Sequence, residues 1–229
     1  MNPLAYCETI AATNPCAEQP LPPNGCCLLG SLNIVKYLVP TYGEWDEIRH
    51  ELDFDLLRHD VGIAVRAMDN VMDKTHYPLE EQRAEEMAKR RMGLGVTGVA
   101  NALEVCGVRY GSPEYIDRQG EILEAIRDTA YETSIVMARA KGTFPLFKAD
   151  PWLASGFAQT LSDKIRSLIY LFGLRNGLLL SIAPTGTISL CADNVSSGIE
   201  PPYSLSATRL VQMPDGPREA LEKMLAIGA

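Results

Sequence analysis

Residues 178–189 read LLLSIAPTGTIS, an apolar run that leads into a turn containing a proline and a glycine. The run Leu178–Ile182 is short, aliphatic and bounded by turn residues, which is typical of a strand buried on both faces. Parallel strands in α/β proteins are buried in this way because helices cover both faces of the sheet. This stretch therefore predicts a parallel strand and an α/β fold.

Amphipathic helices are predicted on both sides of this strand in the sequence. Apolar residues recur at intervals of three and four between Asp53 and Pro78, and again from Ser112 to Gly142, which would be the longest helix. Shorter helical patterns cover residues 80–91, 97–106 and 162–172. A further strand is predicted over Tyr203–Val211. Helices outnumber strands and we see no repeat or linker, so one domain is expected over residues 1–229.

The charge balance and apolar content exclude two classes of protein. The 229 residues include 21 Lys+Arg and 29 Asp+Glu, a formal net charge of −8 at pH 7. Affinity for a nucleic-acid backbone needs clustered cations, so no nucleic-acid partner is expected. The most apolar stretch, 169–182, contains Arg175 and Asn176 and is too short to span a bilayer, and no basic residue precedes Lys36 to form a secretory signal. We expect a cytoplasmic protein with no membrane partner.

The cysteines gather near the start of the sequence. The six positions are Cys7, Cys16, Cys26, Cys27, Cys106 and Cys191, with no CxxC pair among them. The three histidines (His50, His59 and His76) share no spacing that would bring two to one ion, so no metal site is predicted. We interpret Cys7, Cys106 and Cys191 as small core residues. The first 27 residues, which hold four of the six cysteines, are where chemistry is expected.

Three polar side chains alternate in a proline-rich segment, Thr13–Pro23, which reads TNPCAEQPLPP. Proline fixes its own φ and favours extended geometry in its predecessor. In an extended chain alternate residues face the same way, so Asn14, Cys16 and Glu18 would project together. An ordinary alternative is a small buried thiol beside a solvated carboxylate. The segment contains no histidine to activate a hydrolytic cysteine, whereas one-electron chemistry at sulfur needs no such base.

Residues 14–33, NPCAEQPLPPNGCCLLGSLN, closely resemble the active-site loop of class II, adenosylcobalamin-dependent ribonucleotide reductases. Three further blocks resemble the family in its own order: RRMGLGVTG at 90–98, SIAPTGTIS at 181–189 and VSSGIEP at 195–201. Several long, uncommon motifs in one order are not expected by chance. The resemblance runs from about residue 2 to about residue 215 and covers only part of a family member.

The resemblance implies a fold, an activity and three catalytic roles. The fold would be part of a ten-stranded α/β barrel, entered by a finger loop at about residues 10–30. Cys16 matches the cysteine that becomes a thiyl radical, Glu18 the carboxylate that takes the proton of the substrate 3′-hydroxyl, and Asn14 the amide that orients them. The implied reaction reduces ribonucleoside di- or triphosphates to 2′-deoxyribonucleotides, with adenosylcobalamin as cofactor and a thioredoxin-like dithiol as reductant.

Two further elements of the family pattern are matched. Cys27 lies at the position of one reducing cysteine, whose usual partner is upstream of this sequence. Cys26 is either a passive substitution or a competitor for disulfide exchange, and a Cys26–Cys27 bridge would be strained. The loop that holds substrate phosphates in the family maps onto these residues: Pro184, Thr185, Gly186, Thr187 and Ile188. An ordinary helix N-cap is the alternative for that turn.

Other interpretations of the sequence stay open. The chain could be a non-catalytic or complementing fragment of a split reductase, which acts only with a complementary chain or as a homo-oligomer. A class I reductase is another option. Gly93–Gly98 satisfies G-x-G-x-x-G, which would indicate a Rossmann-type nucleotide-binding oxidoreductase. That motif must follow an apolar strand, whereas 84–91 is charged, so the glycines are better explained by close packing or a tight turn.

Overall fold

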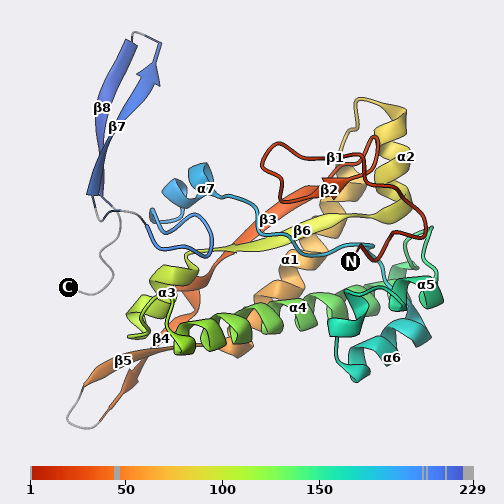
Figure 1. The fold of residues 1–229 in the computed structure, drawn as a ribbon, viewed down its shortest axis with the longest axis horizontal. Helices are drawn as coiled ribbons and strands as arrows, with labels where there is room; N and C mark the ends of the chain where they lie inside the picture. The colour runs from red at the N-terminus through yellow and green to blue at the C-terminus, as the bar shows by residue number, and fades with distance from the viewer. Residues whose placement is uncertain (1, 44–46, 203, 205, 215, 224–229) are drawn as a thin grey trace. The chain divides into compact units, whose positions relative to one another are not determined.

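The computed structural model describes residues 2–43, 47–202, 204, 206–214 and 216–223 (Figure 1). Its contacts group into two compact units, each built from three separate segments. Unit 1 comprises Met1–Leu32, Phe54–Gly95 and Glu121–Ala183, and unit 2 comprises Asn33–Asp53, Val96–Gly120 and Pro184–Ala229. The units alternate along the sequence and do not divide it into consecutive halves. The expectation of one domain stays a prediction.

The helices lie close to their predicted positions. They are α1 Phe54–Lys74, α2 Glu80–Lys89, α3 Val99–Val105, α4 Pro113–Lys141, α5 Ala149–Leu153, α6 Asp163–Phe172 and α7 Gly186–Cys191, with 3₁₀ turns at Ile34–Tyr37 and Ala158–Thr160. Local signals fix several ends. Gly107 and Gly142 take positive φ just after α3 and α4, and the Ser162 side chain accepts a hydrogen bond from the N–H of Ile165 at the start of α6.

The strands depart further from expectation than the helices. They are β1 Ala12–Thr13, β2 Pro20–Leu21, β3 Leu28–Asn33, β4 Leu38–Tyr42, β5 Ile48–Leu52, β6 Met92–Thr97, β7 Ser206–Met213 and β8 Gly216–Lys223. In the described residues they form two-stranded sheets, β1–β2, β3–β6, β4–β5 and β7–β8. The chain is therefore mixed helix and strand, and the ten-stranded barrel stays a prediction. The strand expected over 203–211 is confirmed from Ser206; positions 203 and 205 lie outside the described residues.

One hairpin was missed altogether. The strands β4 and β5 pair antiparallel, with Leu38 opposite Leu52 and Tyr42 opposite Ile48. The sequence signal is weak because each strand has only five residues and Pro40 interrupts the first.

The predicted strand Leu178–Ile182 is wrong in extent. Leu180 makes a single parallel bridge to Leu94 of β6, supported by hydrogen bonds from the N–H of Leu94 to the oxygen of Leu179 and from the N–H of Ser181 to the oxygen of Leu94. The far end of this run, Ile182, is 42% exposed. The strand buried at every position is β6, for which no strand was predicted because its two glycines lower its β-propensity.

Both glycines of β6 allow a close approach of two chain segments. A Cβ on Gly95 would lie 2.3 Å from the oxygen of Ser181, and one on Gly93 would lie 2.7 Å from Ser181 Cβ and 2.8 Å from Leu29 Cδ2. The close-packing interpretation of this motif is confirmed. In a dinucleotide fingerprint the glycines follow the strand, whereas here two lie inside it, which argues against a Rossmann-type site.

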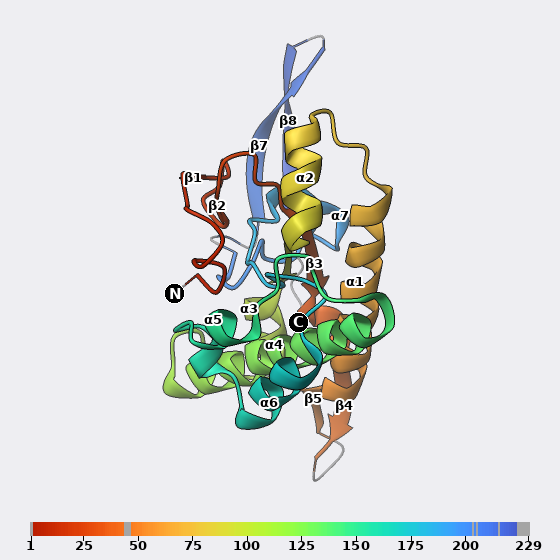
Figure 2. The same ribbon diagram turned by 90° about the vertical axis from the view of Figure 1, so that its right-hand side faces the viewer.

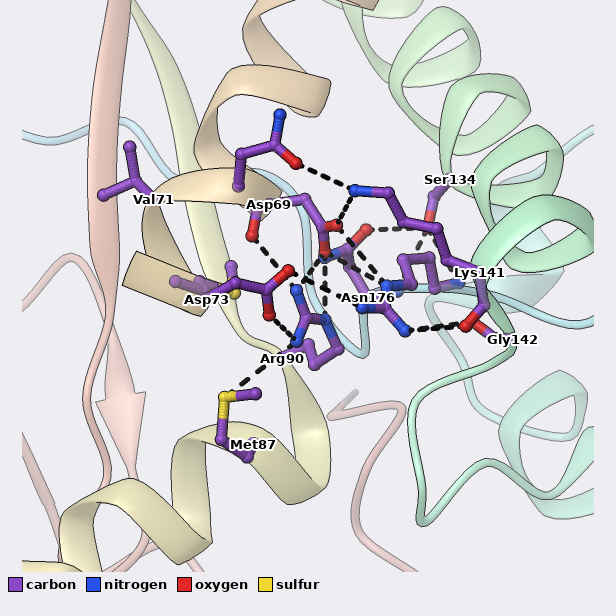
Figure 3. Close-up of polar contacts among 12 residues, drawn as sticks. Asp69, Val71, Asp73, Met87, Arg90, Ser134, Lys141, Gly142 and Asn176 are labelled. Atoms are coloured by element: carbon purple, nitrogen blue, oxygen red, sulfur yellow. Dashed lines mark hydrogen bonds and ion pairs between the residues drawn. The ribbon is translucent and has the colours of Figure 1, made fainter. Parts of the chain in front are cut away.

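A buried carboxylate ties the helices of unit 1 together (Figure 3). Asp69 on α1 is 0% exposed and accepts hydrogen bonds from Arg90 Nη2 and Nε at 2.6 and 2.9 Å. Lys141 at the end of α4 donates to it at 3.2 Å, Arg175 at 3.3 Å and Asn176 at 3.1 Å. Because these donors come from three separate places in the sequence, the cluster fixes the end of α2 and the segment before Leu178 against α1 and α4.

The charge of Asp69 depends on this cluster. Burial alone would raise the pKa of Asp69, but hydrogen bonds and charges from Arg90, with Arg175 and Lys141, lower the pKa below its ordinary value. A carboxyl group of this kind stabilises the fold above its unfolded pKa of about 4, and that stability is lost as the pH falls through the lower, folded pKa.

Replacing Asp69 by asparagine keeps the shape and removes the charge that the buried cations require. Removing one partner of a buried ion pair costs about 3–5 kcal/mol, so we expect the free energy of unfolding to fall by that order at neutral pH. The difference from wild type should shrink as the pH falls below about 4, because the unfolded wild-type chain then binds a proton at Asp69, and it should disappear once the folded protein binds that proton at its lower pKa. Urea unfolding, with amide hydrogen exchange of α1 and α4, measures both effects in the full-length protein that carries this chain.

The matched control is Asp55→Asn, because the Asp55 side chain is fully exposed at the start of α1. We expect that variant to lie within about 0.5 kcal/mol of wild type. An Asp69→Asn protein as stable as the control at neutral pH would contradict the assigned role.

Candidate active site

The predicted site residues fall in both units. Asn14, Cys16, Glu18 and Cys27 belong to unit 1, and the predicted phosphate loop 184–188 begins the last segment of unit 2.

The segment expected to be extended is instead a hairpin. The strands β1 and β2 pair antiparallel, with Ala12 opposite Leu21 and Thr13 opposite Pro20, and residues 14–19 form the connecting turn. The same prolines that suggested an extended chain allow the turn, because proline pre-sets the φ that the second turn position needs. The prediction that alternate side chains share one face of a strand is therefore wrong.

Asn14 organises the turn. The N–H of Ala17 donates to the backbone oxygen of Asn14 at 3.0 Å. Asn14, Pro15, Cys16 and Ala17 are therefore the four positions of a β-turn. The Asn14 side-chain oxygen also accepts from the N–H of Gln19 at 3.0 Å. Ala17 takes a φ of +66°, which folds the chain back toward β2. The side-chain oxygen of Asn14 is used by the turn, so its N–H₂ group is the part that can act on a ligand.

The turn presents one thiol and one carboxylate. Cys16 is exposed at the third position of the turn, which excludes the interpretation of a buried structural thiol. Glu18 is half-buried, and its Oε2 atom is buried with no hydrogen-bond partner among the described residues. The Glu18 backbone oxygen accepts from Ser181 Oγ at 2.9 Å, so the hairpin rests on the segment that follows Leu178–Leu180. The structure thus places all three predicted residues on one hairpin tip.

A second turn leads to the other predicted cysteine. The N–H of Gly25 donates to the oxygen of Pro22 at 3.0 Å, and Asn24 takes a φ of +59°. Asparagine tolerates this conformation at the third position of a turn. Cys26 and Cys27 follow, immediately before β3, and both are free thiols.

Burial and nearby carboxylates hold the proton on Cys27. Burial is the largest cause that raises the pKa of Cys27 to about 12, and the charge of Glu86 is the next. Arg91 acts in the opposite direction, and Glu18 and Cys26 raise the pKa further. Because Glu18 influences Cys27 electrostatically, the Cys27 thiol and the carboxylate of the hairpin tip belong to one neighbourhood.

Sequence analysis missed three residues of this neighbourhood. Ser181 and Gln19 seat the hairpin, since a Cβ on Gly93 would lie 3.1 Å from Gln19 Nε2. Glu86 is buried beside Cys27. Its position in a charged helix offers no signal that separates it from Glu85, because only the packing shows which of the two turns inward.

The predicted phosphate loop lies at the start of a helix, and the hydroxyl of Thr185 in this loop forms a hydrogen bond within the protein. The helix α7 begins at Gly186, after Thr185, whose side chain is 2% exposed and donates to Thr97 Oγ1 at 2.9 Å. The next three positions, 186–188, are exposed, and a Cβ on Gly186 would meet nothing within 4 Å. Thr185 therefore holds the loop in place, and the exposed helix start is the part open to a ligand.

Three smaller expectations can be compared with the structure. Cys191 is exposed at the end of α7 and is not a core residue as predicted, whereas Cys7 and Cys106 are half-buried. In the described residues, no group of three or more His, Cys, Asp or Glu side chains could hold a metal ion. None of the described helices is both long and apolar enough to cross a membrane.

Comparisons with known proteins agree on one family. The family model "Ribonucleotide reductase, barrel domain" matches residues 1–224. The vitamin B12-dependent ribonucleoside-diphosphate reductases of Thermoplasma acidophilum and Mycobacterium tuberculosis (strain H37Rv) are each 34% identical over 92% of this chain, which corresponds to 24% and 26% of their own lengths. A ribonucleoside-diphosphate reductase subunit alpha of Chlamydia muridarum is 33% identical over 77% of the chain and 18% of its own length.

The chain thus spans about a quarter of the length of the vitamin B12-dependent reductases it matches. The matched region includes the Cys16 hairpin, the glycines of β6 and the start of α7. With a family model that covers nearly every residue, this chain belongs to the ribonucleotide reductase barrel-domain family.

Proposed function

We propose that this chain forms part of the catalytic core of an adenosylcobalamin-dependent ribonucleotide reductase, which converts ribonucleotides to 2′-deoxyribonucleotides. The observation that carries the proposal is the β-turn Asn14–Ala17, which exposes Cys16 at a hairpin tip beside a partly buried Glu18. Family membership supplies the reaction class. The hairpin corresponds to the finger loop of the proposed barrel.

Cys16 and Glu18 divide the first steps between them. As a thiyl radical, Cys16 removes the hydrogen atom from C3′ of the ribose, a step that suits the strength of an S–H bond. Glu18 takes the proton of the 3′-hydroxyl, which helps to expel the 2′-hydroxyl as water. The buried, unpartnered Oε2 of Glu18 is available for that hydroxyl, and the amide N–H₂ of Asn14 orients the ribose.

Two electrons must come from a dithiol in each turnover. Cys27 supplies one thiol, and a second cysteine outside this chain supplies the other, so a thioredoxin-like dithiol must reduce the resulting disulfide. The influence of Glu18 on Cys27 supports a common site for both steps. Cys26 is also a free thiol, and we propose that it is a passive neighbour because a vicinal disulfide is strained.

The cofactor proposal rests on the exposure of Cys16 and on the relatives. An exposed thiol at a turn tip fits a radical source that approaches from outside the hairpin. When bound, adenosylcobalamin supplies the radical equivalent that turns a thiol into a thiyl. The vitamin B12-dependent relatives match 92% of the chain and the subunit alpha relative 77%, which favours class II over class I.

The substrate is proposed to be a ribonucleoside diphosphate, because the relatives named above are diphosphate reductases. Its phosphates are assigned to the loop Pro184–Ile188, where the exposed helix start offers backbone N–H groups. The chain spans about a quarter of these relatives, so the remainder of the enzyme comes from the same polypeptide or from a complementary chain. The intact mass of the native protein, which also reports a homo-oligomer, distinguishes these arrangements.

Replacing Cys16 by serine should abolish deoxyribonucleotide formation in the full-length enzyme, because a hydroxyl cannot take part in hydrogen abstraction as sulfur does. Nucleotide affinity should stay unchanged, since the turn is held by Asn14 and not by the thiol. Product formation and equilibrium dialysis measure the two effects separately. The control is Cys191→Ser, another exposed cysteine, which should keep full turnover. Turnover by Cys16→Ser would contradict the assignment.

Replacing Glu18 by glutamine keeps the side-chain shape and removes the base. General base catalysis contributes roughly 10²- to 10⁴-fold, so we expect kcat to fall within that range while substrate affinity changes little. A Glu114→Gln variant on the exposed first turn of α4 removes the same charge and should behave as wild type. Equal turnover of the Glu18→Gln and wild-type enzymes at every pH would show that Glu18 serves only the structure.

A further inference from the structure

The buried carboxyl group of Glu86 lies near Cys27, the proposed redox cysteine. The strand β3 begins just after Cys27, β6 begins just after Arg91, and the two strands pair (Figures 1 and 2). A Cβ on Gly93 would lie 2.8 Å from Leu29, so the beginnings of the two strands are in contact. The Glu86 side chain belongs to the last turn of α2 and interacts electrostatically with Cys27 and with Arg91, the residue before β6.

Glu86 forms no ion pair with a cation among the described residues. Its side chain is 3% exposed, and its Oε1 atom has no hydrogen-bond partner among the described residues. Arg91 instead donates from Nη2 to Glu8 at 2.6 Å. Burial is the largest cause that raises the pKa of Glu86 to about 8, with Arg91 and Arg90 opposing it. Glu86 therefore carries a proton at neutral pH and can release it close to that pH.

Cys27 is a poor leaving group in its present surroundings. Its pKa of about 12 is set first by burial and then by Glu86. Thiol–disulfide exchange slows as the pKa of the leaving thiol rises, so a disulfide that contains Cys27 breaks slowly unless the departing sulfur is protonated. A proton donor with a pKa near the working pH serves this purpose best.

We propose that Glu86 is the general acid that protonates the Cys27 sulfur when its disulfide is reduced, a role that rests on the proposed function of Cys27 as a redox thiol. A thiolate of the dithiol reductant attacks the other sulfur, the S–S bond breaks, and Cys27 leaves with the electron pair and takes the proton of Glu86. The second reductant thiol then releases the second protein thiol from the mixed disulfide. The reductant loses two electrons, the protein disulfide gains two, and Glu86 regains a proton from solvent.

Groups from several elements face this pair. Those that interact with Glu86 or Cys27 are Glu18, Cys26, Tyr77, Glu85, Arg90 and Arg91. The two arginines favour the carboxylate form of Glu86, whereas Glu85 and burial favour the protonated form. Glu18 and Glu86 each have a buried carboxyl oxygen without a hydrogen-bond partner among the described residues, and burial raises the pKa of Glu86 to about 8.

A model disulfide tests the proposal without nucleotide or cobalamin. In the full-length protein carrying Cys26→Ser, so that no adjacent thiol interferes, methyl methanethiosulfonate converts Cys27 to its methyl disulfide. Dithiothreitol then attacks the methyl-bearing sulfur, which makes Cys27 the leaving group. Peptide mass spectrometry follows the return of the Cys27 thiol from about pH 6 to about pH 10, across the range in which exchange rates are measurable.

Glu86→Gln should slow this return by about tenfold or more below pH 8, because the proton donor is gone. The ratio of the wild-type rate to the Glu86→Gln rate should fall toward one as the pH rises through about 8, where wild type loses the same proton. Glu86→Asp keeps a carboxyl group, so its rate should lie between those of Glu86→Gln and wild type. Glu81→Gln, on the exposed side of α2, is the charge-matched control and should leave the rate unchanged.

Two results would overturn the proposal. One is a rate ratio near one at every pH in a Glu86→Gln protein whose circular dichroism matches wild type. The other is a Cys27 that forms no methyl disulfide in the folded protein, since the exchange requires access from outside. Neither result bears on hydrogen abstraction, which the Cys16→Ser variant tests separately.

Discussion

Burying the carboxylate of Asp69 is tolerable only because several donors converge on it. Arg90 follows α2 and leads directly into β6, while Asn176 and Arg175 precede Leu178–Leu180. The same charge therefore fixes the starting points of the two segments that pair through Leu94 and Leu180. Without it, buried Arg90 would keep a single ion-pair partner among the described residues, the half-exposed Asp73, and that arrangement is costly.

The second constraint is the space between those two segments. Glycine at positions 93 and 95 lets Ser181 approach β6 so closely that any Cβ would collide with it. Ser181 in turn donates to the Glu18 backbone oxygen, so the hairpin that carries Cys16 is held through its backbone as well as by the buried side chain of Gln19. This arrangement leaves the thiol of Cys16 exposed and the carboxylate of Glu18 partly buried, which is what the proposed division between radical and base requires.

Local rules predicted most helices, because apolar periodicity and caps such as Ser162 and Gly142 act within a few residues. The strands were harder to predict. In β6, for example, the sequence does not show that the glycines are needed to let Ser181 pack against the strand. The prolines between Thr13 and Pro23 predicted an extended segment, because they cannot distinguish extended geometry from a turn closed by Asn14. The candidate residues Asn14, Cys16, Glu18 and Cys27 came from resemblance to a family. Glu86 could not be found in that way, because the sequence does not show which side of α2 is buried.

The central claim is that Cys16 is the sulfur that carries the radical. The direct measurement is rapid-freeze electron paramagnetic resonance of the full-length enzyme mixed with adenosylcobalamin and ribonucleotide. Enzyme that contains β-deuterated cysteine is compared with unlabelled enzyme. The account predicts a sulfur-centred signal whose lines narrow on deuteration, which is lost in Cys16→Ser and kept in Cys191→Ser. A signal of unchanged intensity in Cys16→Ser would contradict it.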